Sequence, residues 1–149
     1  MQKASIILIL IIALFSGYSA NAQNYKAALG IRISSTPPVI NNSVSFKYFF
    51  KEKTAVEALL SFDPFALGAL LEKYNDLNVQ GLTWFYGGGV YVAFSGTRNV
   101  GAQGILGLDY AFQNLPINVS VDWKPELNLA SEFSFEPGAV GVGVRFIFK

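Results

Sequence analysis

The sequence contains no cysteine and no histidine. Without cysteine there can be no disulfide bond, no thiolate nucleophile and no lipid-modified cysteine after a signal peptide, and cysteine usage gives no indication of the redox compartment. Without histidine, a serine nucleophile has no histidine general base beside it, and the usual ligands of a zinc site are missing. We therefore predict a protein that is not an enzyme and that holds no metal or cofactor.

Charge is also scarce. Only 14% of the 149 residues are charged and 52% are hydrophobic, whereas an ordinary soluble domain carries about 25% charged residues. The formal net charge is +1, and no block of like charge is present. This distribution argues against nucleic acid as a partner. We expect a single domain that has few charged groups to hydrate its surface.

The chain has no apolar run long enough for a membrane-spanning helix, which needs about 20 residues. The longest run, Ala4 to Phe15, follows Lys3 and is followed by the small-x-small sequence Ala20-Asn21-Ala22 before Gln23. These are the parts of a secretory signal peptide. We predict a cleaved signal peptide over residues 1–22 and one mature domain over residues 23–149. An uncleaved N-terminal anchor is the alternative.

Apolar and polar or small residues alternate with a period of two along the mature chain, which is typical of half-buried β-strands. The pattern predicts eight strands, at residues 25–34, 43–50, 55–62, 66–74, 82–94, 104–112, 117–129 and 139–148. Residues 95–103 and 130–138 are predicted to be loops. The fourth segment is ambiguous, because its Ala-Leu-Leu-Glu-Lys sequence could also form a helical loop. The turn sequences Asp63-Pro64 and Asn75-Asp76 on either side favour a strand.

The polar face of these strands mixes charged side chains with glycine, alanine and serine. An eight-stranded barrel has an interior just wide enough for side chains, so we predict that this face fills the interior. The predicted interior network has five cationic and five acidic members: Lys26, Arg32, Lys47, Lys124, Arg145, Glu57, Glu72, Asp109, Asp122 and Glu126. Their equal numbers fit a closed interior, where an unpaired ion is costly, although a near-neutral chain can also balance by chance.

The apolar face carries most of the aromatic residues, many near strand ends. Aromatic girdles at the two membrane boundaries are expected of transmembrane β-barrels. The predicted membrane-interface aromatics are Tyr25, Tyr48, Trp84, Tyr86, Tyr110, Trp123, Phe146 and Phe148. The fold prediction is therefore all-β: a closed, antiparallel, up-and-down transmembrane β-barrel of about eight strands. A soluble barrel with an aromatic core is the alternative.

Two motifs are candidates for a catalytic or a phosphate-binding site. Asp109 and Asp122 could form an acid/base pair, but interior carboxylates facing arginine and lysine are more often structural. The run Gly87-Gly88-Gly89 is not followed by Gly-Lys-Ser/Thr, so it lacks the rest of a phosphate-binding loop. We interpret these glycines as positions where packed interior side chains need space.

The chain resembles the small outer-membrane β-barrel proteins of Bacteroidetes-type bacteria, which are related in form to the OmpA transmembrane domain. The resemblance lies in LTWFYGGG at residues 82–89, GILGLDY at 104–110, NVSVDWKP at 118–125 and VGVRFIF at 142–148. The last of these is similar to the C-terminal signal of the barrel-assembly machinery, although Lys149 follows the usual terminal aromatic.

The resemblance implies a monomer in the outer membrane of a Gram-negative cell, in contact with lipid and inserted by the barrel-assembly machinery. It assigns no reaction. The expected role is structural, or binding through the loops, in the cell envelope, with the loop partner left open. The alternative is a soluble periplasmic, lipocalin-like barrel that carries an apolar ligand.

Overall fold

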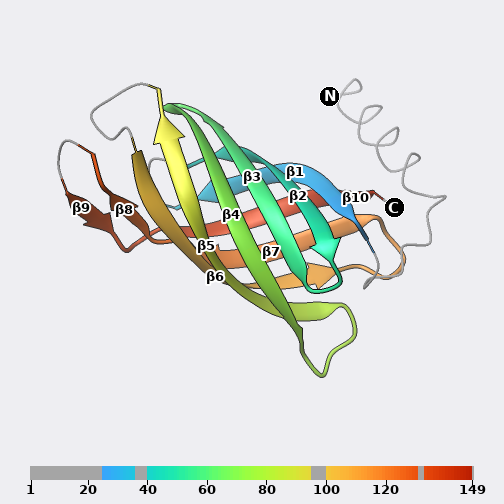
Figure 1. The fold of residues 1–149 in the computed structure, drawn as a ribbon. Helices are drawn as coiled ribbons and strands as arrows, with labels where there is room; N and C mark the ends of the chain where they lie inside the picture. Colours follow the sequence, from blue (N-terminus) through green and yellow to red (C-terminus); the bar gives the residue numbers. More distant parts are fainter. Residues whose placement is uncertain (1–24, 36–39, 95–99, 131–132, 149) are drawn as a thin grey trace, which may run out of the picture.

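The computed structural model describes residues 25–35, 40–94, 100–130 and 133–148. Within these ranges the chain forms a single antiparallel sheet that closes into a barrel (Figure 1). The predicted signal peptide, the cleavage site before Gln23, and Lys149 lie outside the described residues. In the described part of the chain, no helix is long and apolar enough to cross a membrane.

The sheet is an up-and-down meander of ten strand segments. They are β1 (Ala27–Ser34), β2 (Ser43–Lys51), β3 (Thr54–Phe62), β4 (Phe65–Asp76), β5 (Leu82–Ala93), β6 (Val100–Ala111), β7 (Ile117–Trp123), β8 (Glu126–Asn128), β9 (Ser134–Glu136) and β10 (Val140–Phe148). Segments β7 and β8 both pair with β6, and they pair on their other side with β10 and β9. Each of these two couples is therefore one interrupted strand, and the barrel has eight strands. The pairing of β1 with β10 closes it, which confirms the prediction of an all-β, closed, antiparallel, up-and-down barrel of eight strands.

The break between β7 and β8 falls at Lys124-Pro125, where proline has no N–H to give to the ladder. Pairing continues across the break through other groups. The Lys124 N–H donates to the Ala139 carbonyl at 2.8 Å, and the Gly104 N–H donates to the Pro125 carbonyl at 3.0 Å. The predicted strand over residues 117–129 thus continues in the same direction on both sides of the proline.

The ambiguous fourth segment is the strand β4, and this strand includes Asn75 and Asp76, which were predicted to be a turn. Two predicted loops are also wrong in part. Residues 100–103, predicted as loop, belong to β6 and pair with β5, from Gly89↔Gln103 to Val92↔Val100. Residues 134–136 lie in the predicted loop 130–138 but form β9. In both places the backbone groups of a neighbouring strand need partners, although the local sequence shows no clear alternation.

The two ends of the barrel differ. At the end where β1 begins and β10 finishes, here called the termini end, the connections are residues 52–53, 77–81 and 112–116. At the opposite end, here called the loop end, β1, β3, β5 and β8 finish and β2, β4, β6 and β9 begin. The β8–β9 hairpin extends at the loop end (Figure 1).

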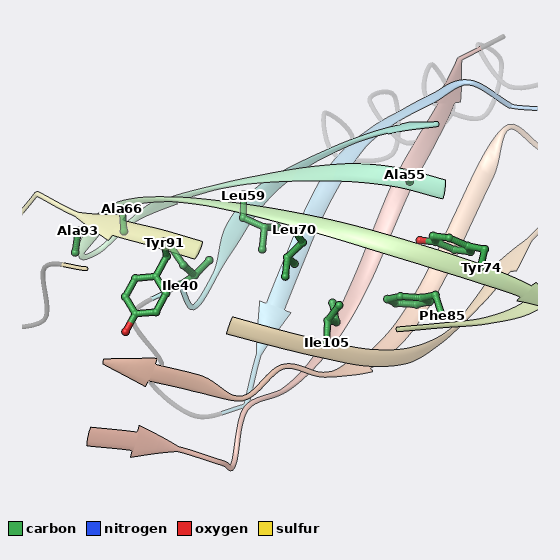
Figure 2. Close-up of a cluster of buried hydrophobic side chains, with 10 residues drawn as sticks. All are labelled: Ile40, Ala55, Leu59, Ala66, Leu70, Tyr74, Phe85, Tyr91, Ala93 and Ile105. Carbon is green, nitrogen blue, oxygen red and sulfur yellow. The ribbon is translucent and has the colours of Figure 1, made fainter. Parts of the chain in front are cut away.

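An apolar cluster fills part of the interior between β3, β4, β5 and β6 (Figure 2). Its members are Ile40, Ala55, Leu59, Ala66, Leu70, Tyr74, Phe85, Tyr91, Ala93 and Ile105. Ile40 belongs to the connection after β1, yet it is fully buried, and its N–H donates to Glu126 Oε1 at 3.1 Å. Ile40 therefore lies inside the loop end of the barrel.

Candidate functional site

The rest of the interior is filled by charged and polar side chains. Nine of the ten charged residues predicted to lie inside are at most 3% exposed: Arg32, Lys47, Glu57, Glu72, Asp109, Asp122, Lys124, Glu126 and Arg145. They come from β1, β2, β3, β4, β6, β7, β8, β10 and the β7–β8 break. The side-chain period of two in each strand turns all of them to the same side of the sheet.

Arg145, from β10, lies at the centre of the largest group of contacts. Its Nη2 donates to Glu57 Oε1 at 2.6 Å, and its Nε donates to Ser45 Oγ at 2.7 Å. Its Nη1 donates to Ser120 Oγ at 2.8 Å. Glu57 also accepts a hydrogen bond from Ser45 Oγ at 2.5 Å. A single guanidinium therefore links β2, β3, β7 and β10 across the barrel.

Arg32 and Asp122 form a second, two-pronged pair. Arg32 Nε donates to Asp122 Oδ2 at 3.0 Å, and Arg32 Nη2 donates to Oδ1 at 2.5 Å. Such fork-to-fork pairs are the strongest ion pairs that arginine forms with carboxylates. The Arg32 guanidinium needs a glycine at position 141, because a Cβ there would lie 2.3 Å from Arg32 Nη2.

Lys47 forms a third group with aromatic neighbours. Its Nζ lies 3.0 Å from Glu72 Oε2 and 4.7 Å from the centroid of the Phe85 ring. It donates to the Tyr74 hydroxyl, which donates in turn to Glu72 Oε2 at 2.9 Å. Asp109 is more distant, with its Oδ2 at 3.9 Å from Lys47 Nζ. The ammonium is thus held by one carboxylate and by ring faces, which attract cations.

The fourth group lies towards the loop end. Lys124 Nζ donates to Glu126 Oε1 at 2.6 Å and to Gln103 Oε1 at 3.2 Å. Gln103 was not among the predicted site residues, because it fell in the segment predicted as loop. Its position opposite Gly89 in the β5–β6 register is what turns it inward.

Two predicted placements are wrong. Lys26 is exposed and takes no part in the interior network. Tyr25, predicted to face outward, packs inward with its ring 5.1 Å from the Phe49 ring, and its hydroxyl is buried. The ladder between β1 and β10 starts only at Ala27, so the alternation is not imposed on the two residues before it. The described interior therefore holds four cations and five carboxylates instead of five of each.

The other predicted aromatics lie on the outside of the barrel. Tyr48, Trp84, Tyr86, Trp123 and Phe148 are between 37% and 45% exposed, and Tyr110 and Phe146 are half-buried. Most lie towards the termini end, where Trp84 stacks on Tyr86 and Phe146 packs against Phe148.

A second group of exposed aromatics lies towards the loop end: Phe62, Phe65, Phe94, Phe133 and Phe135. The rings of Phe65 and Phe94 lie 5.4 Å apart. Phe65 precedes the predicted strand at residues 66–74, and its pairing with Phe62 across the β3–β4 ladder brings it to the outside. Exposed aliphatic side chains of the strands lie between the two groups, among them Ile31, Leu67, Val90, Leu108, Val121 and Val144.

A small cavity of about 110 Å³ opens at the termini end. Its walls are Tyr25, Phe49, Glu52, Lys53, Tyr74, Asp76, Gly81, Thr83, Asp109 and Ala111. At its rim Lys53 Nζ donates to Asp76 Oδ2 at 2.9 Å. This hydrogen bond, together with the negative charge of Asp76, raises the pKa of the exposed Lys53 ammonium above its usual value.

The arrangement offers charge pairing and a small cavity. Asp109 and Asp122 are held in separate groups, by Asn118 and Arg32 respectively. Among the described residues no cluster of carboxylates could hold a metal ion. No protein-family model matches the chain, and no curated protein or solved structure is significantly similar to it.

Proposed function

We propose that this chain is a non-enzymatic integral outer-membrane β-barrel protein of a Gram-negative cell, with a structural or loop-mediated binding role in the envelope. The observation that carries the proposal is the inverted distribution of side chains. Large apolar residues cover the outside of the barrel, while nine charged residues are buried inside it. Soluble domains have the opposite arrangement.

The outside supports a lipid environment. Exposed aliphatic side chains form a band between the aromatics of the termini end and Phe62, Phe65 and Phe94, as in the apolar band and girdles of outer-membrane barrels. In water the same surface would be an apolar patch far larger than the few hundred Å² that soluble monomers usually expose. The pairing of β1 with β10 also closes the barrel wall, so that wall has no open sheet edge, which hydrocarbon could not hydrate.

The inside argues against the lipocalin-like alternative. A carrier of an apolar ligand needs an apolar chamber, but here ion pairs occupy the middle of the barrel. Four of the five interior carboxylates, those of Glu57, Glu72, Asp122 and Glu126, have a cationic nitrogen within 3.0 Å. The cavity of 110 Å³ lies at one mouth and has three acidic residues in its walls.

The connections support an orientation. Outer-membrane barrels have short periplasmic turns and longer extracellular loops, so we expect the termini end to face the periplasm. Insertion of the exported monomer by the barrel-assembly machinery would then leave the β8–β9 hairpin, with the exposed side chains of Phe133 and Phe135, outside the cell. These two residues are the part of the described chain best placed for a loop-mediated contact.

The two tryptophans test the membrane assignment directly, because both lie on the outside of the barrel. The mature protein would be refolded into vesicles whose acyl chains are partly brominated, since bromine quenches indole fluorescence on contact. We expect strong quenching of the tryptophan fluorescence in these vesicles. We also expect that heating changes the migration of the protein on gels, and that the protein fractionates with outer membranes. A protein that stays in the soluble periplasmic fraction and whose fluorescence is not quenched would overturn the proposal and favour the soluble barrel.

A further inference from the structure

The cavity at the termini end is next to the place where, among the described residues, the interior charges do not balance. Towards the loop end, Arg32 pairs with Asp122 and Lys124 pairs with Glu126, at 2.5 and 2.6 Å. Nearer the termini end, two cations serve three carboxylates. Arg145 lies 2.6 Å from Glu57 and Lys47 lies 3.0 Å from Glu72, whereas the third carboxylate, Asp109, has only the longer contact of 3.9 Å to Lys47 Nζ.

Asp109 lines the cavity, and one of its carboxylate oxygens has no hydrogen-bond partner. The residue is 3% exposed, and its Oδ1 accepts a hydrogen bond from Asn118 Nδ2. Its Oδ2 has no hydrogen-bond partner, and the nearest cation, Lys47 Nζ, is 3.9 Å away. A buried carboxylate oxygen left in this state is costly. A donor with a positive charge, entering from the cavity, would satisfy it.

The other walls match an organic cation. The rings of Tyr25 and Phe49 lie 5.1 Å apart, those of Phe49 and Tyr74 lie 4.9 Å apart, and all three line the cavity. The buried Tyr25 hydroxyl also has no hydrogen-bond partner. At the rim, Glu52 and Asp76 outnumber Lys53. Aromatic faces and surplus negative charge together attract ammonium groups.

The size of the cavity limits the ligand. Because a cavity of about 150 Å³ takes up benzene, the 110 Å³ found here accommodates a group of about four or five non-hydrogen atoms. We propose that this cavity binds a small alkylammonium ion, with its ammonium on Asp109 Oδ2 and its carbon chain against the rings of Tyr25, Phe49 and Tyr74. The inference does not depend on whether the barrel lies in a membrane.

Titration of the refolded mature protein with propylammonium, followed by calorimetry or by ligand-observed NMR, tests this site. We expect saturable binding with a Kd on the order of 1 mM, within the limit for so small a ligand. Propan-1-ol has the same shape without the charge and should bind at least about tenfold more weakly, because a charge-assisted hydrogen bond is lost.

Three variants make the test specific. Asp109→Asn should weaken propylammonium binding by about tenfold or more. Asp63→Asn is the matched control, because it makes the same change in the exposed β3–β4 turn at the opposite end, and it should leave the Kd unchanged. Ala111→Leu fills the cavity without touching a charge and should also abolish binding. Heat-dependent gel migration shows that each variant is folded.

The ammonium could come from a free amine or from a lysine side chain of a polypeptide. N-acetyl-lysine methylamide separates these sources: binding as tight as that of propylammonium supports a lysine, and weaker binding supports a free amine. The proposal is overturned if folded protein does not bind propylammonium, if propan-1-ol binds equally well, or if Asp109→Asn binds as tightly as the unsubstituted protein. In those cases the charge of Asp109 is neutralised by other means, such as a bound proton.

Discussion

Replacing Arg145 with leucine is the most informative single change to the barrel. The guanidinium is 2% exposed and donates to Glu57, Ser45 and Ser120 at 2.6 to 2.8 Å. After the substitution Glu57 keeps its hydrogen bond from Ser45 but loses its nearest cation. Breaking a buried ion pair in this way costs about 3 to 5 kcal/mol. With an m-value of about 2 kcal/mol per molar urea, the unfolding midpoint falls by about 2 M.

The measurement is urea unfolding of the protein in lipid vesicles, followed by tryptophan fluorescence. Lys53→Leu is the control, because it removes a cation from an exposed ion pair at the rim and should hardly move the midpoint. The double variant Arg145→Leu/Glu57→Leu should recover much of the loss, since no buried charge is then left alone. If Arg145→Leu and Lys53→Leu behave alike, the guanidinium is not buried in a closed interior and the reasoning fails.

Four further predictions follow from the same structure. Val121→Arg should cost about 2 to 4 kcal/mol in vesicles if this exposed residue faces mid-membrane lipid, and an unchanged urea midpoint would place it in water. Gly89→Ala should prevent folding in a gel-migration assay, because its Cβ would lie 1.8 Å from a β4 carbonyl oxygen, whereas Gly88→Ala meets nothing closer than 3.5 Å and should fold. Planar-bilayer recordings should show no large, porin-like conductance, because side chains fill an eight-stranded interior; stable large steps would contradict this. N-terminal sequencing of protein extracted from the envelope should begin at Gln23, and a sequence that starts at Met1 would refute the cleavage.

The predicted loop over residues 95–103 is wrong in part, because a strand can form where the local sequence has no alternating pattern. Its glycines and polar residues look like a loop, and Arg98 and its neighbours lie outside the described residues. Yet Gln103 is buried in β6, because the residue pairs with Gly89 of β5. Strand pairing is a long-range property, and a partner strand can hold a segment whose own pattern is weak.

The cavity at the termini end could not be predicted from the sequence. Asp109 was expected to be one of ten balanced interior charges, and Tyr25 was expected to face outward. The inward turn of Tyr25 and the exposure of Lys26 follow from where the β1–β10 ladder starts, at Ala27. No local signal marks that boundary. The surplus of one carboxylate beside an aromatic-lined space therefore appears only once the barrel is closed.

The sequence alone determined the strands and the two faces of the barrel. Alternation with a period of two is a local property of the pleated backbone, so the burial of Arg32, Glu57 and Arg145 was readable residue by residue. The tertiary structure decided which strands extend, which residues meet across the interior, and which carboxylate has only a distant cation. Those features depend on the register and closure of all eight strands together, and register is set between strands that are far apart in the chain.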